Sequence, residues 1–100
     1  IFLMDAGKKI IAKVCSYRSP QRYALERTLQ AAMAQVHKEH PELSLEIVEI
    51  RDVQEILSIT PVLILPSLVI NDRLVCTGRF PRKEEVADWL IDSWKEMISG

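Results

Sequence analysis

Cysteine and histidine, the residues most often used as redox nucleophiles and zinc ligands, are few in this chain. The two cysteines, Cys15 and Cys76, lie far apart in the sequence, which excludes a Cys-x-x-Cys pair for redox chemistry or zinc. The two histidines, His37 and His40, fall where a helix is expected to end. Imidazoles at that end are favoured by the helix dipole and are usually solvated. We therefore expect no metal site, no cofactor and no disulfide scaffold.

Length and charge restrict the class of protein. One hundred residues make one domain, and 48% apolar residues are enough for a packed core. Thirteen lysines and arginines stand against fourteen acidic residues, which argues against a protein that neutralises nucleic-acid phosphates. The longest apolar run, residues 61–66, is far shorter than the roughly 20 residues of a membrane span. We expect a soluble, cytoplasmic protein, with membranes excluded and nucleic acid disfavoured as partners.

Residues 1–8 do not have the features of a signal peptide. They lack a basic start, a long apolar run and a small-residue cleavage site. We treat them as an N-terminal extension and expect a single domain over residues 9–98. Two alternatives stay open, namely a native segment throughout and residues added in front of a start at Met4.

The pattern of apolar residues predicts the secondary structure. β-Branched runs indicate strands, three- and four-residue spacings indicate helices, and Asn71-Asp72 between two short apolar runs indicates a hairpin turn. Ser19 is the expected N-cap of the first helix, and Pro41 is expected to end it near His40. Asp52 is the expected cap of the second helix. In chain order we expect a strand over 9–15, a helix over 19–40, a strand over 43–51, a helix over 53–59, strands over 67–70 and 73–76, and a helix over 82–98.

The order of these elements predicts an α/β fold. A strand–helix–strand unit is right-handed and gives parallel strands, and the hairpin adds an antiparallel pair. The economical arrangement is a four-stranded mixed sheet with helices on both faces. Trp89 and Trp94 share the apolar face of the last helix, so both are expected in the core.

The second half of the chain carries a family resemblance. Leu65-Pro66 opens the third strand, the hairpin follows, and Gly78-Arg79-Phe80-Pro81 leads into the last helix. This pattern resembles thioredoxin-like proteins, and the closest type is the short redox-active-disulfide group related to glutaredoxin. The resemblance covers roughly residues 9–98. It implies strand order 2-1-3-4, a cis peptide bond before Pro66 and a substrate cleft beside that proline.

The Cys-Pro-x-Cys motif of that family is missing. Its position, at the start of the first helix, reads Ser19-Pro20-Gln21-Arg22. The family reaction needs a thiolate at the helix N-terminus and a second thiol to resolve the mixed disulfide, and serine has no redox couple. The implied strand order holds Cys15 and Cys76 about 9–10 Å apart, too far for a disulfide. Both are expected to be buried apolar residues, with Cys15 left open as a single reactive thiol.

Basic side chains are expected to gather at the cleft that the resemblance implies. Arg18, Arg22 and Arg79 would surround the first turn of the helix and hold an anion or a partner's acidic side chain. The alternative is that these cations are solvated or paired with nearby carboxylates. Those carboxylates are Glu26, Glu84 and Glu85. The candidate cleft residues are Tyr17, Arg18, Ser19, Pro20, Arg22, Leu65, Pro66, Gly78 and Arg79.

Three functional hypotheses follow. The first is a redox-inactive module that binds a partner protein or peptide in the cleft. The second is a glutaredoxin-like oxidoreductase that uses Cys15 as a single thiol in cell redox homeostasis. The third is a regulator similar to the thioredoxin-like circadian-clock proteins, which also lack the cysteine pair. The identity of the partner, the pathway and the oligomeric state stay open.

Overall fold

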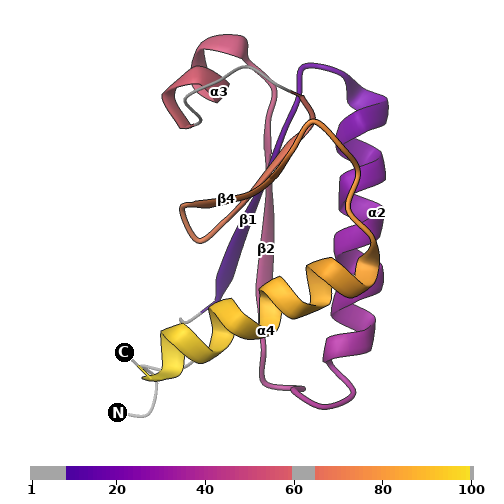
Figure 1. Cartoon of the computed structure of the whole chain (residues 1–100), viewed down its shortest axis with the longest axis vertical. Helices are drawn as coiled ribbons and strands as arrows, with labels where there is room; N and C mark the ends of the chain where they lie inside the picture. The colour runs from indigo at the N-terminus through magenta and orange to yellow at the C-terminus, as the bar shows by residue number, and fades with distance from the viewer. Residues whose placement is uncertain (1–8, 60–64, 100) are drawn as a thin grey trace.

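A computed structural model describes residues 9–59 and 65–99 of the chain. They form a four-stranded sheet with three helices (Figure 1). The elements are β1 (Ile10–Cys15), α2 (Ser19–Val36), β2 (Leu45–Ile50), α3 (Val53–Ile59), β3 (Ser67–Ile70), β4 (Arg73–Thr77) and α4 (Lys83–Ser99). None of these described helices is long and apolar enough to cross a membrane. The extension expected over residues 1–8 lies outside the described residues.

The sheet has the expected strand order, β2-β1-β3-β4. β1 pairs in parallel with β2 and antiparallel with β3, and β3 pairs antiparallel with β4. The predicted mixed α/β fold is therefore confirmed. β2 is an edge strand, and it lies within the range 43–51 expected from the sequence.

The hairpin turn falls where the sequence predicts it. Asn71 and Asp72 have φ angles of 48° and 67°, the left-handed conformation that a two-residue hairpin turn of type I′ requires. The Asn71 side-chain oxygen accepts from the N–H of Ile11 at 2.9 Å, and the N–H of Asn71 donates to the oxygen of Ile11 at 2.9 Å. The turn is therefore fastened to β1 as well as closing its own hairpin.

The first helix ends at Val36, and its expected end near His40 is wrong. Beyond Val36 the chain tightens, because Lys38 N donates to Gln35 O at 3.3 Å and Glu39 N donates to Val36 O at 3.1 Å. Hydrogen bonds over three residues are typical of the narrower 3₁₀ turn that often closes a helix. The His40 N–H still donates to Val36 O at 2.8 Å. His40, where the helix was expected to end, is therefore the last residue of the turn that follows the helix.

Two apolar clusters pack on opposite faces of the sheet. The main cluster lies between the sheet and helices α2 and α4, and the smaller one lies beneath α3. Trp94 is buried and Trp89 is partly buried against the main cluster, which confirms their expected core position. Cys76 belongs to the main cluster and Cys15 to the smaller one. The two thiols are therefore on different faces of the sheet.

Candidate functional site

The loop between β1 and α2 is organised by the hydroxyl of Ser16. Ser16 is fully buried, its hydroxyl donates to Gln21 Oε1, and it accepts from the N–H of Arg18 at 3.0 Å. Its own N–H donates to Ile50 O at 3.1 Å. These bonds fix the loop to the end of the sheet. Ser16 was not among the expected cleft residues, because no local pattern distinguishes a buried serine from an exposed one.

The N-cap of α2 is Arg18, and the expected cap at Ser19 is wrong. Arg18 has extended backbone angles of φ −100° and ψ 119°, and no side chain caps this helix end. Ser19 is already helical, and its hydroxyl accepts from Arg22 Nη2 at 3.0 Å. The Ser19 hydroxyl therefore holds the Arg22 guanidinium within the first turn of the helix. Pro20 lies in the first turn, where a missing N–H has no cost.

Arg22 is a buried structural group, and its expected place on a solvent-facing rim is wrong. Its side chain and backbone together are only 5% exposed. Arg22 Nη1 donates to Ser16 O at 3.0 Å, and Nε lies 3.5 Å from Glu49 Oε1, an ion-pair contact without hydrogen-bond alignment. Arg22 thus ties the loop and the helix to β2, at the position where the family has its second cysteine.

Two glutamates extend this network on the β2 side. Glu49 Oε1 also accepts from Arg51, at 2.6 Å from Nη2 and 3.0 Å from Nε. A hydrogen bond to Glu49, with burial adding to it, raises the pKa of Glu26, whereas the same bond and that from Arg51 lower the pKa of Glu49. Glu49 is therefore the more acidic of the two carboxyl groups, and it is the one that contacts Arg22.

Arg79 is paired with Glu85, so it is not a free cation. Arg79 Nη1 and Nη2 donate to the two carboxylate oxygens of Glu85 at 3.0 and 2.9 Å. Glu85 Oε1 also accepts from the N–H of Arg82 at 3.0 Å. The bond from Arg79, followed by that from Arg82, lowers the pKa of Glu85 to about 2. This outcome is the pairing alternative that the sequence left open.

Four of the described residues line a small hollow beside the start of α2, which we call the Tyr17 hollow. They are Tyr17, Arg18, Gln21 and Leu65, and the hollow has a volume of about 290 Å³. Tyr17 is 55% exposed, and the Arg18 guanidinium carbon lies 5.9 Å from the centre of its ring. The hollow thus offers an aromatic face, a cation and an apolar wall. Gln21 was missing from the expected cleft residues, although it lies within the quartet that replaces the family motif.

Pro66 lies next to Leu65 and joins this region to the loop after β4. The Leu65–Pro66 peptide bond is cis, and Pro66 is buried. Pro66 O accepts from the N–H of Gly78 at 2.9 Å. Gly78 has φ of 78°, a left-handed conformation that glycine adopts without steric cost. Gly78 therefore holds Pro66 in place through its backbone.

Both cysteines are buried and free. Burial is the main cause that raises the pKa of Cys15 to about 11, and the charge of Lys13 only partly opposes it. Burial likewise raises the pKa of the Cys76 thiol. Since the thiolate is the nucleophilic form, a thiol held protonated reacts slowly at neutral pH. Neither cysteine is in the environment of a reactive thiol.

The histidines take part in local packing contacts. His37 Nε2 lies 2.8 Å from Leu43 O, and His40 Nδ1 lies 3.7 Å from Glu42. Within residues 9–59 and 65–99, no three His, Cys, Asp or Glu side chains are grouped closely enough to hold a metal ion.

Comparison with known proteins bears on residues 9–91. A family model described as "Thioredoxin domain" matches this range, which covers all four strands and most of α4. None of the curated proteins compared with the chain matches it.

Proposed function

This chain belongs to the thioredoxin-domain family, and from that premise we propose that it is a redox-inactive member that binds an extended peptide of a partner protein. The observation that carries the proposal is the buried Arg22 at the position of the family's second cysteine. Its guanidinium donates to Ser16 O and to the hydroxyl of Ser19, which stands at the first cysteine position. Where the family has two cysteines for disulfide exchange, this chain has Ser19 and Arg22, whose hydrogen bonds hold the loop before the helix.

The peptide would enter the Tyr17 hollow, which supplies its recognition chemistry. A volume of about 290 Å³ is at the low end for ligand pockets and suits one side chain of a peptide. Arg18 is exposed and can bind a carboxylate through two parallel donors, while Tyr17 and Leu65 offer apolar contact. We therefore favour a segment in which an acidic residue flanks an aromatic or aliphatic one. A cytoplasmic location, where thiols stay reduced, belongs to the same proposal.

The single-thiol alternative has less support. Cys15 is fully buried beneath α3, and its pKa of about 11 keeps it protonated under physiological conditions. A reactive thiol would need an electropositive and partly exposed environment. A regulator similar to the circadian-clock proteins also has less support, because the Asn71-Asp72 hairpin and the last helix fit the ordinary thioredoxin arrangement better.

A peptide titration tests the proposal. The probe is an eight-residue peptide in which two glutamates flank a phenylalanine, and the control peptide carries lysines instead. We expect amide shifts confined to Tyr17, Arg18, Gln21 and Leu65 for the acidic peptide. Arg18→Gln should weaken binding by about tenfold, the loss of one charge-assisted contact. Arg27→Gln, which removes an exposed arginine elsewhere on α2, should leave it unchanged.

Two results would contradict this function. Equal weakening by both arginine variants, or equal binding of the lysine peptide, would mean that the hollow does not recognise acidic peptides. Disulfide-reductase turnover that is abolished in Cys15→Ser would replace the proposal with the single-thiol enzyme.

A further inference from the structure

The edge strand β2 presents unpaired backbone groups on one side. Ile10 N donates to Ser44 O at 2.8 Å, and Ser16 N donates to Ile50 O at 3.1 Å. In a parallel ladder these bonds turn the even-numbered residues of β2 towards β1 and leave the backbone groups of Leu45, Ile47 and Glu49 facing outward. No strand among the described residues pairs with this outer side.

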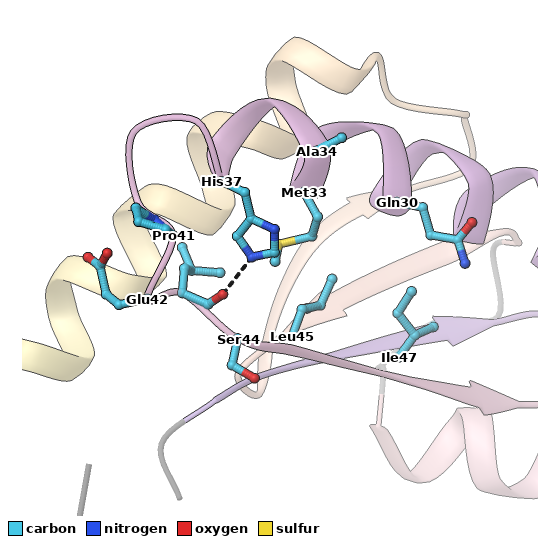
Figure 2. A pocket seen from close by; sticks show the side chains of 10 residues that line it. Gln30, Met33, Ala34, His37, Pro41, Glu42, Ser44, Leu45 and Ile47 are labelled. Carbon is cyan, nitrogen blue, oxygen red and sulfur yellow. Dashed lines mark hydrogen bonds between the residues drawn. The ribbon is translucent and has the colours of Figure 1, made fainter. Parts of the chain in front are cut away.

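A groove runs along the same edge, between β2 and the second half of α2. We call it the β2 groove, and its volume is about 810 Å³. Figure 2 shows Met33 of α2 and His37, the residue after its end, pointing towards β2, with Leu45 and Ile47 pointing back at the helix. Met33, Leu45 and Ile47 are only partly buried, so part of their apolar surface lines the groove.

A hydrogen-bonded contact holds the end of the groove that lies nearest the loop between α2 and β2. The His37 ring contacts Leu43 O at 2.8 Å across the loop that joins α2 to β2 (Figure 2). Leu43 is buried in the main cluster, which anchors that loop. The groove is therefore shaped in the free protein and need not be formed by its occupant.

Among the described residues that line the groove, Glu42 has the acidic side chain. Glu42 lines the groove and is exposed, and β2 itself contributes Glu46 and Glu49. Lys9 lies 3.3 Å from Glu46, and Arg51 and Arg22 contact Glu49, so the carboxylate that is least compensated is that of Glu42. Its neighbour His40 is 3.7 Å away.

We propose that the β2 groove binds an extended segment of a partner protein that adds to the sheet as a fifth strand beside β2. The outward backbone groups of β2 would pair with the segment, and alternate apolar side chains would enter the groove against Met33 and Ile47. A lysine or arginine of the segment would lie beside Glu42. This site is separate from the Tyr17 hollow, which lies at the opposite end of α2.

A second copy of the chain fits this edge less well. The β2 strand of a second copy carries Glu46 and Glu49 among its apolar residues, and it has no lysine or arginine to lie beside Glu42. The occupant is therefore a basic, alternating apolar strand of another protein.

The probe is an eight-residue peptide of alternating lysine and valine, titrated into the full chain. We expect hydrogen-exchange protection of the Leu45, Ile47 and Glu49 amides, and weaker binding at higher salt. Ala34→Arg fills the groove from an exposed position on α2 and should weaken binding by about tenfold. Ala31→Arg adds the same charge at an exposed position outside the groove, and it should leave the binding of the peptide unchanged.

Further comparisons make the test decisive. Glu42→Gln should weaken the lysine peptide but not a threonine–valine peptide, and Arg18→Gln should have no effect on either. Equal binding of a glutamate–valine peptide, absence of protection along β2, or equal effects of the two alanine variants would overturn the proposal. A dimer in sedimentation with the same amides protected before peptide is added would assign the edge to a second copy instead.

Discussion

Arg22 Nη1 donates to the main-chain oxygen of Ser16 across 3.0 Å, which joins the first helix to the end of β1. The same guanidinium reaches the hydroxyl of Ser19 and the carboxylate of Glu49. Three separate segments of the chain thus depend on one buried cation. The family places a thiol at this position, and here the position has a mechanical role in the fold.

Replacing this cation should destabilise the protein. Arg22→Met removes both hydrogen bonds and leaves Glu49 without one of its partners, so we expect a loss of about 2–4 kcal/mol in the free energy of unfolding. Arg22→Lys should recover only part of it, because an ammonium lacks the planar fork. Denaturant titration measures the difference. Arg27→Met, at an exposed position of the same helix, should change stability by at most ~0.5 kcal/mol, and a similar loss in both variants would refute a special role for Arg22.

The first turn of α2 should still activate a thiol if one is introduced. Ser19→Cys would place a sulfur beside the free N–H groups of the helix start and beside Arg22, both of which stabilise a thiolate. We expect a cysteine pKa below the roughly 8.5 of a free thiol. Alkylation rates measured against pH give this value. Arg27→Cys is the control for an exposed thiol in mid-helix, and an equal pKa in the two variants would contradict the expectation.

Alkaline conditions should destabilise the protein through Cys15. Its pKa rises from 9.0 to about 11 on folding, so above pH 9 the unfolded chain loses a proton that the folded chain keeps. The contribution of Cys15 to the free energy of unfolding is therefore fully present below pH 9 and is lost as the pH rises towards 11. Denaturation midpoints across this range measure the fall. Cys15→Ala should show a shallower decline, and an unchanged decline would assign it to other groups.

Acid should act through the Arg79–Glu85 pair. The pKa of Glu85 falls from 4.5 to about 2 on folding, so its contribution is present above pH 4.5 and is lost as the pH falls towards 2. Glu85→Gln should flatten the acid limb of the stability profile, and thermal unfolding between pH 2 and pH 5 measures it. Glu84→Gln removes the neighbouring exposed charge and serves as the control. Identical acid limbs in the wild type and Glu85→Gln would show that the pair is not coupled to folding.

The elements whose cause is local could be predicted from the sequence. Asn71 and Asp72 tolerate positive φ, so their dipeptide identifies the hairpin, and Asp52 caps α3 as expected, since its Oδ2 accepts from the N–H of Glu55 at 3.2 Å. The strand order followed from the family resemblance and is confirmed.

The candidate site was predicted less well, because its charges are settled by distant partners. An arginine in a helix pattern is usually exposed, and nothing near Arg22 in the sequence indicates that Glu49 of β2 will meet it. Arg79 could be read either as a free cation or as a partner of Glu85, and only the fold decides. Tyr17, Arg18 and Leu65 do lie together, and whether they bind a peptide stays a prediction.

Because the two thiols lie on opposite faces of the sheet, the rate at which each one becomes accessible reports on the opening of a different part of the protein. Cys15 is sealed by the small cluster under α3, a helix of seven residues, whereas Cys76 is sealed by the large cluster under α2 and α4. Detachment of α3 alone would uncover Cys15, whereas Cys76 lies on the edge strand β4, is already 6% exposed and contacts Arg79 O at 3.5 Å, so it responds to the loop after β4. Local openings involve less buried surface than global unfolding and occur more often. The rate at which a thiol label reacts with Cys15 in the native protein should therefore measure how loosely α3 is attached, independently of the rate at Cys76.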